Sequence, residues 1–295
     1  MSYGFTFCAF RFSLYTIHEL GLREKGNSYT INLKIRMELI MIKKINVLLL
    51  AGGKSKISMR KFTGKENKAL IEIGPRRKPM ILYIIEALKK SKYTDKIMVA
   101  GPEEVQKLVK DLVYLTISEG QTIPDTLKSG ILSLKKEPLI LISTCDAPLI
   151  TEKHIDCFIK ECYGCPGFDI YYPIIDKEVY QQSFPSSDLR RVYANLVEGT
   201  FTGGNILLIN PRIITDFADT INDFIYFRKH PLKMARLLGA RITTKYLRKY
   251  LSIQDLEKKV PELLGGYKGK AILSPPEIAL DIDKPRHLKA LWHNY

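Results

Sequence analysis

The sequence has few cysteines, one tryptophan, a shortage of acidic side chains and no long hydrophobic run. Five cysteines are too few for a disulfide-stapled scaffold, and their odd number predicts a reducing compartment, the cytoplasm. The longest uncharged apolar run, near 45–53, is far shorter than the roughly 20 residues of a membrane-spanning helix, so we expect no membrane partner. The 295 residues are otherwise average, with 45% hydrophobic and 26% charged, and they can build a substantial core.

The acidic shortage leaves a strong positive charge. The chain has 46 Lys and Arg against 31 Asp and Glu, a net charge of +15, which attracts phosphates, nucleic acids or anionic lipids. Residues 225–270 hold twelve basic and three acidic side chains, so nine of the fifteen excess charges fall there. This basic segment predicts a surface for an anionic partner, although a solvated helical face explains it equally well.

The first forty residues differ from the rest. They are rich in aromatic side chains without regular spacing, and Met37 and Met41 lie just before a regular strand pattern. They do not resemble a secretory signal. We predict that the protein starts at one of these methionines and that residues 1–40 are a non-native or loosely attached extension. Residues 41–295 are expected to form one domain with a basic, partly helical insertion at about 211–268.

From residue 45 on, apolar runs alternate with helical spacing. Strands are expected at 45–50, 96–101, 113–117, 139–143, 169–172, 204–209 and 278–282. Helices are expected at 79–90, 103–111, 123–134, 151–162, 231–238 and 252–264. Ser252 and Asp255 have the spacing of a capping box for the last helix. The alternation predicts an α/β fold with a doubly wound, mostly parallel sheet flanked by helices, whose ligands bind beyond the carboxyl ends of the strands.

Five motifs follow one another along this pattern. They are 50–55 (LAGGKS), 67–74 (NKALIEIG), 78–81 (KPMI), 144–149 (TCDAPL) and 281–285 (DIDKP). The glycines after the first strand let backbone N–H groups approach phosphates. Three of the motifs have a simpler explanation when taken alone: a tight turn for the glycines, a helix cap for Asp146 and a local turn for Asp283.

Taken in this order, the motifs resemble the MobA-like NTP transferases, the nucleotidyltransferase branch of the GT-A (nucleotide-diphospho-sugar transferase-like) fold. The resemblance covers about 45–288 and is looser over 181–265. It implies transfer of a nucleoside monophosphate from an NTP, with GTP or CTP favoured, to an anionic, phosphorylated small molecule, releasing pyrophosphate. The family has Arg and Met where this chain has Ile57 and Ser58, so Lys54, Lys56 or Arg60 is expected to supply the missing charge.

The resemblance also implies the site residues. Lys68 and Asp146 would be catalytic, and Mg²⁺ or Mn²⁺ would bind Asp146 and Asp283, with Asp281 as a further candidate. Nucleotide contacts are expected from Leu50, Ala51, Gly52, Gly53, Lys54, Lys68 and Thr126. The segment 200–205 (TFTGGN) looks like a substrate-side loop, expected to contribute Thr202, Gly203, Gly204 and Asn205 together with Arg191.

The residue types suit this chemistry. Carboxylate oxygens are the ligands that Mg²⁺ prefers, and positive groups stabilise the charge that grows on phosphate oxygens during transfer. Asp146 and Asp283 would repel each other at neighbouring strand ends unless a cation lay between them. We therefore expect their carboxyl groups within about 4–6 Å of each other, a separation that allows one shared ion.

Two other functions and a zinc site stay open at this point. A glycosyltransferase using a nucleotide-sugar shares the fold and would use the Asp281-x-Asp283 spacing for its metal. A nucleic-acid-binding protein would use the basic segment, but no aromatic stacking platform accompanies it. His154, Cys157, Cys162 and Cys165 offer soft ligands for zinc, although 151–162 has the spacing of an ordinary amphipathic helix.

Overall fold

The computed structural model describes residues 44–132, 134, 137–227 and 231–294. The expected extension, 1–40, lies outside these residues. By its internal contacts, Lys43–Tyr295 is one compact unit. None of the helices in the described ranges combines the length and hydrophobicity needed to cross a membrane.

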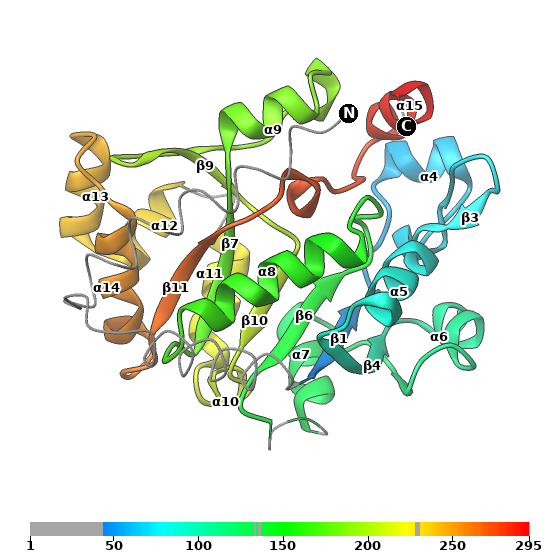
Figure 1. Cartoon of the computed structure of the whole chain (residues 1–295), viewed down its shortest axis with the longest axis horizontal. Helices are drawn as coiled ribbons and strands as arrows, with labels where there is room; N and C mark the ends of the chain where they lie inside the picture. Colours follow the sequence, from blue (N-terminus) through cyan, green and yellow to red (C-terminus); the bar gives the residue numbers. More distant parts are fainter. Residues whose placement is uncertain (1–43, 133, 135–136, 228–230, 295) are drawn as a thin grey trace, which may run out of the picture. The chain divides into compact units, whose positions relative to one another are not determined.

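Within the described residues, nine strands form one sheet (Figure 1), ordered β5-β4-β1-β6-β10-β7-β9-β8, with β11 paired to β7. The strands are β1 (Ile45–Leu50), β4 (Thr94–Ala100), β5 (Leu115–Ile117), β6 (Ile140–Thr144), β7 (Ile170–Asp176), β8 (Ala194–Leu196), β9 (Gly199–Gly203), β10 (Ile206–Ile209) and β11 (Gly269–Leu273). The β5-β4-β1-β6 half is parallel. The other half is mixed, because β10 runs antiparallel to both β6 and β7. A separate hairpin pairs β2 (Glu72–Ile73) with β3 (Lys78–Pro79).

Helices cover both faces of the sheet, which confirms the α/β fold. Figure 1 shows α5 (Met80–Lys90) and α8 (Glu152–Gly164) in front of it, and α7 (Ile123–Leu132), α10 (Arg212–Asp216) and α11 (Ala218–Phe227) behind it. The remaining helices are α4 (Ile57–Thr63), α6 (Glu103–Val109), α9 (Lys177–Ser183), α12 (Pro231–Leu238), α13 (Ala240–Leu247), α14 (Ile253–Leu263) and α15 (Pro285–Asn294), with 3-10 turns η1 (Lys68–Leu70), η2 (Ser187–Leu189) and η3 (Pro276–Ala279).

Burial on both faces of the sheet explains why the sequence of β1 is continuously apolar. Val47, Leu48 and Leu49 of β1 have no exposed surface, because helices cover both faces of this central strand. Leu48 packs behind the sheet with side chains of α7 and α10, including Ile131 and Ile213. The expected strands and helices of the first half, from 45 to 162, all form within a few residues of their predicted bounds.

The predicted strand at 278–282 is wrong. Residues up to Ala279 form the turn η3, and 280–284 pair with no strand. Pro275 and Pro276 favour this turn, since proline fixes its own φ and lacks an N–H for a sheet. Ile278 and Ile282 are nevertheless fully buried, so a buried loop gave the same apolar pattern as a strand.

Three further differences lie in the second half of the sheet. The strand β7 is longer than expected because it continues through Pro173, which lies opposite Ile272 of β11. The expected strand 204–209 begins at Ile206, because Gly203 ends β9. The hairpin β8–β9, the strand β11 and the helix α13 have no counterpart in the sequence-based assignment.

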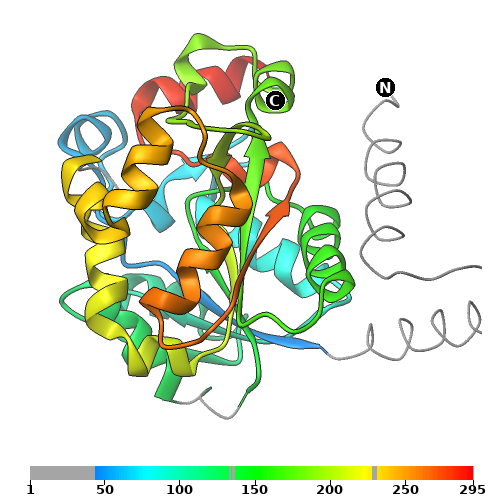
Figure 2. The same cartoon turned by 90° about the vertical axis from the view of Figure 1, so that its left-hand side faces the viewer.

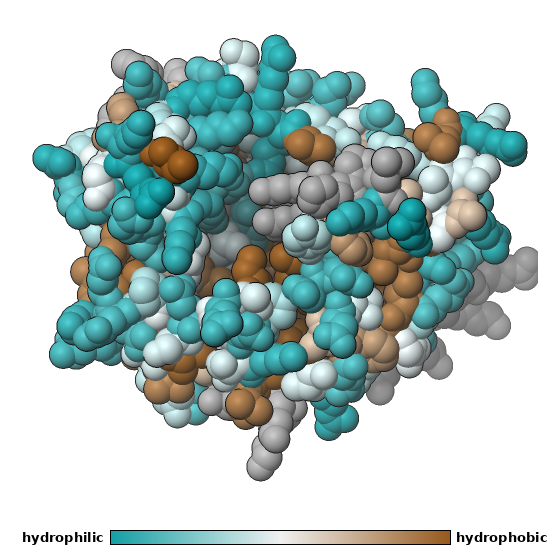
Figure 3. Space-filling view, turned by 180° about the vertical axis from the view of Figure 1, so that it is seen from behind, coloured by the Kyte–Doolittle hydropathy of each residue, from teal (hydrophilic) through white to brown (hydrophobic). Residues whose placement is uncertain are grey.

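The basic segment contributes α12, α13 and α14, drawn in yellow to orange on one side of the sheet in Figure 2. Three of its lysines are paired: Lys245 with Asp255, Lys259 with Glu262 and Lys270 with Glu257. The face opposite to that of Figure 1 is largely hydrophilic, with hydrophobic side chains in smaller groups (Figure 3). Part of the positive charge of the basic segment is therefore neutralised by acidic neighbours within the same segment.

The capping box of α14 gives a pH-dependent prediction. The Ser252 hydroxyl accepts from the Asp255 N–H at 3.1 Å, Asp255 accepts from the Ser252 N–H at 3.2 Å, and Lys245 lies 2.5 Å from the carboxylate. The hydrogen bond from Lys245, followed by that from Ser252, lowers the pKa of Asp255 to about 2 from 3.8. Because the folded pKa is the lower one, this stabilisation is complete above about pH 4 and is lost as the pH falls towards 2.

Asp255→Asn should therefore lower the free energy of unfolding by about 1 kcal/mol at neutral pH, and by much less near pH 2. Urea unfolding at the two pH values measures the difference. Glu262→Gln is the control, because its pair with Lys259 is exposed to solvent, where an ion pair contributes little to stability. An equal loss for Asp255→Asn at both pH values would contradict this account of the cap.

Candidate active site

The site lies beyond the carboxyl ends of β1 and β6. Asp146 follows β6 closely, and the Ile282 N–H donates to the Asp146 carbonyl oxygen at 2.8 Å. Since Ile282 is fully buried, it fixes the segment 280–284 against the end of β6. Asp281 and Asp283, its two neighbours, are thereby held beside Asp146.

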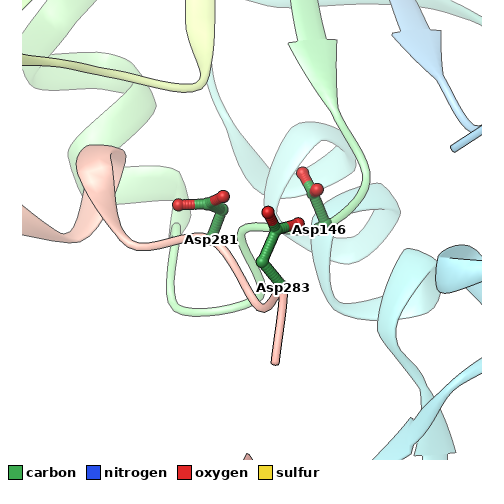
Figure 4. Close-up of side chains that lie close together, drawn as sticks. All are labelled: Asp146, Asp281 and Asp283. Atoms are coloured by element: carbon green, nitrogen blue, oxygen red, sulfur yellow. The ribbon is translucent and has the colours of Figure 1, made fainter. Parts of the chain in front are cut away.

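Asp146, Asp281 and Asp283 form a carboxylate triad (Figure 4). One oxygen from each of Asp146, Asp281 and Asp283 lies within 4.8 Å of the others. The expected approach of Asp146 to Asp283 is confirmed. The helix-cap explanation for Asp146 is wrong, because Thr151 is the N-cap residue of α8.

Lys68 occupies the space between two of the carboxylates. Its Nζ lies 2.9 Å from Asp146 Oδ2 and also contacts Asp283 Oδ1. The side chains of Lys68 and Asp146 are only 16% and 15% exposed. The cation expected between the two aspartates is thus supplied, in this structure, by the chain itself.

The preceding Asn67 explains why Lys68 points into the site. The Asn67 side chain donates to the Ala51 carbonyl oxygen at 2.9 Å and accepts from the Ala69 N–H at 2.7 Å. The Lys68 N–H donates to the Gly53 carbonyl oxygen at 3.0 Å. The Asn-Lys pair is therefore fastened to the glycine loop after β1.

These contacts set the charges of the site. Burial lowers the pKa of Lys68, but Asp146 and Asp283 outweigh it, so the pKa lies above its usual value. Burial raises the pKa of Asp283, but hydrogen bonds from Lys56 and Lys68 outweigh it, so the pKa lies well below its usual range. At neutral pH, Lys68 is protonated and Asp283 is ionised.

Of the three residues expected to supply the missing positive charge, Lys56 is the one that contacts the carboxylates. Its Nζ lies 2.6 Å from Asp283 Oδ2. Arg60 instead pairs with Glu66 at 2.8 Å, and Lys54 forms a backbone bridge with Asn67. Sequence analysis left these three open, because the partner of Lys56 lies 227 positions away.

The loop between β5 and α7 places a carboxylate, that of Glu119, against the glycine loop after β1. A Cβ added to Gly52 would lie 1.9 Å from Glu119 Oε2, so the Glu119 carboxylate covers this glycine. Thr126, an expected nucleotide contact, is buried and accepts from the Gly120 N–H at 2.9 Å while donating to the Thr122 carbonyl oxygen at 3.0 Å. Its hydroxyl thus shapes the loop that presents Glu119.

The expected substrate-side residues lie on the other side of the triad. Arg191 contacts Asp281 Oδ1, and its Nη2 donates to the Gly203 carbonyl oxygen at 3.3 Å. Asn205 fastens this loop, because its side chain and its N–H both donate to the Ile278 carbonyl oxygen, at 3.0 and 2.9 Å. Thr202 is buried within β9.

The zinc alternative gains no support. His154 Nδ1 accepts from the Thr151 N–H at 3.2 Å, and Nε2 lies 3.5 Å from Glu277. Among the side chains that the structure describes, Asp146, Asp281 and Asp283 are the one group of three or more residues that could hold a metal. Three carboxylates offer hard oxygen ligands, which suit Mg²⁺ or Mn²⁺ better than zinc.

Comparisons with known proteins identify the family and the fold. A family model of the MobA-like NTP transferase domain matches residues 47–249. A hypothetical transferase from Thermus thermophilus has a similar structure, with 29% identity, a TM-score of 0.71 and coverage of 83% of this chain and 99% of that chain. A comparison with curated protein sequences finds no match.

Two more distant structures share the fold. A CMP:2-keto-3-deoxy-manno-octonic acid synthetase solved with CTP has 12% identity and a TM-score of 0.53, covering 84% of this chain and 96% of that chain. A 4-diphosphocytidyl-2C-methyl-D-erythritol synthase from Anaerococcus prevotii has 12% identity and a TM-score of 0.50, covering 85% and 96%.

Proposed function

The chain belongs to the MobA-like NTP transferase family, and we propose that it transfers the nucleoside monophosphate of GTP or CTP to a phosphorylated small molecule, releasing pyrophosphate. The observation that carries this proposal is the bridge from Lys68 to both Asp146 and Asp283. The bridge places two carboxylates that can hold a metal ion beside a partly buried positive charge, next to the glycine loop. A cytoplasmic location stays a prediction.

The proposed reaction needs positioning and charge stabilisation. An acceptor oxygen forms a bond to the α-phosphorus while the bond to the pyrophosphate oxygen breaks, and negative charge grows on the leaving group. A phosphate acceptor is already deprotonated, so no side chain has to remove a proton. The groups at the triad are carboxylates and cations, which suits such an acceptor.

Asp146 and Asp283 are the residues that would hold Mg²⁺ or Mn²⁺. When bound, the ion would neutralise phosphate oxygens and orient the triphosphate. Lys68 and Lys56 contribute positive charge from the same side of the triad. If the ion replaced the lysines as the partner of the carboxylates, Lys56 and Lys68 would be free to contact the triphosphate.

Glu119 is expected to influence the choice of base. A carboxylate can accept two adjacent N–H donors from guanine but one amino group from cytosine, and a bidentate contact discriminates by about 1–3 kcal/mol. Glu119→Gln should therefore lower kcat/KM for GTP relative to CTP by about tenfold or more. Equal effects on both nucleotides would exclude Glu119 as the residue that distinguishes them.

A thermal-shift screen of the four NTPs tests the function directly. A ligand at a hundred times its Kd stabilises the folded state by about 2.7 kcal/mol, so the cognate NTP with Mg²⁺ should raise Tm clearly. Asp146→Asn should lose the metal-dependent part of the shift. Protection by nucleotide-sugars but by no NTP would favour the glycosyltransferase instead.

A further inference from the structure

The triad receives its cations from two sides. Lys56 and Lys68 precede α5 in the chain, whereas Arg191 precedes β8. In the sheet, β1 lies on one side of β6 and the strands β10, β7, β9 and β8 lie on the other. Because Asp146 follows β6, the lysines approach the triad from the β1 half and Arg191 approaches from the β9 half.

The three carboxylates divide according to these partners. Lys68 bridges Asp146 and Asp283, and Lys56 adds a second contact to Asp283. Asp281 is instead paired with Arg191. Figure 4 shows the three carboxylates near one another, so the division lies in their ion-pair partners rather than in their separation. By their ion pairs, the carboxylates divide into Asp146 and Asp283, which lysines contact, and Asp281, which Arg191 contacts.

Both acceptors of the Arg191 guanidinium are held firmly. One is Asp281, next to the buried Ile282, and the other is the Gly203 carbonyl oxygen. A Cβ at Gly203 would lie 2.0 Å from the Tyr172 hydroxyl oxygen, so the loop packs closely against β7. The side chains of Arg191 and Asp281 are only 21% and 24% exposed. Arg191 is therefore oriented before any ligand arrives.

The two contacts leave several N–H donors of the Arg191 guanidinium available to a ligand. A guanidinium has five N–H donors in a planar fork that matches phosphate and carboxylate groups, and its two contacts here engage Nη1 and Nη2. We propose that Arg191 binds the anionic group of the acceptor and that Asp281 is a positioning residue for Arg191 rather than a third metal ligand. This inference rests on the proposed nucleotidyl transfer and names the residue that selects a phosphorylated acceptor.

Metal titration tests the role of Asp281. Mn²⁺ binding is followed by electron paramagnetic resonance with the protein saturated by a non-hydrolysable NTP analogue. Asp283→Asn should weaken Mn²⁺ binding by about tenfold or more, whereas Asp281→Asn should stay within about twofold of wild type. Equal losses in the two variants would make Asp281 a metal ligand and overturn the proposal.

Phosphate titration tests Arg191. Inorganic phosphate is titrated calorimetrically into the protein saturated with Mg²⁺ and the same analogue, so that the triphosphate positions are filled. Arg191→Gln and Asp281→Ala should each weaken phosphate binding by about tenfold, and the double variant should be no weaker than Arg191→Gln, because both act through one guanidinium. Arg190, the exposed neighbour of Arg191, provides the matched control. The phosphate affinity of Arg190→Gln should stay within about twofold of that of wild type.

The outcomes separate this inference from the proposed function. If wild type binds the analogue with Mn²⁺ but binds no phosphate, or if Arg190→Gln weakens phosphate binding as much as Arg191→Gln does, the acceptor role of Arg191 is overturned and the proposed function stands. If wild type does not bind the analogue at all, nucleotidyl transfer itself fails and the inference falls with it. Thermal unfolding of each variant confirms that it is folded.

Discussion

Lys68→Ala should lower kcat/KM by an amount equivalent to about 2–4 kcal/mol of transition-state stabilisation, the usual cost of one preorganised electrostatic donor. Lys68 is partly buried and protonated, and its own N–H holds it against the glycine loop. Its positive charge therefore needs little reorganisation to stabilise a leaving pyrophosphate. The rate of pyrophosphate release measures the loss.

Lys61→Ala is the matched control, since Lys61 is exposed in the last turn of α4 and belongs to the same loop region. We expect wild-type turnover from it. Circular dichroism and thermal unfolding show whether each variant is folded. Normal turnover by a folded Lys68→Ala protein would remove Lys68 from the site.

Asp146→Asn and Asp283→Asn should each abolish detectable NTP turnover, the largest effect that we expect. The two carboxylates come from segments 137 positions apart and meet at one Lys68 ammonium group. If they also share one metal ion, either variant removes the same function. The double variant should then be no worse than either single variant. Asp188→Asn, an exposed carboxylate in η2, is the control.

Stability gives a second measurement on the same variants. From the sequence alone, repulsion between the two carboxylates would make either substitution stabilising in the absence of metal. The structure changes this expectation, because Lys68 and Lys56 already offset the repulsion. Asp283→Asn should therefore lower Tm in a metal chelator, and a clear rise would contradict the ion pairs described here.

The sequence was sufficient for the first half of the sheet and for the centre of the site. Apolar runs of β1 and β6 end at Gly52 and near Asp146, and the carboxyl ends of parallel strands meet at one edge. That rule was sufficient to predict that Asp146 and Asp283 lie close together, and the motif around Lys68 added the lysine to the same site. Asp283 was located correctly although the strand expected to carry it does not form, because the buried Ile282 serves the same positioning purpose.

The missed features depend on contacts between distant segments. The partners of Lys56 and Arg191 lie 227 and 90 positions away, and local periodicity carries no information about such pairs. The position of Glu119 over Gly52 likewise depends on distant segments, because the two residues lie in the loops after β5 and β1. The strand β7 was cut short because proline is rare inside strands, yet Pro173 is accommodated there.

The central claim is tested most directly with GTP or CTP radiolabelled at the α-phosphorus, incubated with the protein, Mg²⁺ and the small-molecule fraction of a cell extract. The account predicts a new labelled compound, formed in equal amount to the pyrophosphate released, and no such compound with Asp146→Asn or with a metal chelator. Label that stays in the NTP, or label that leaves as a free nucleotide with no new compound formed, would contradict nucleotidyl transfer by this site.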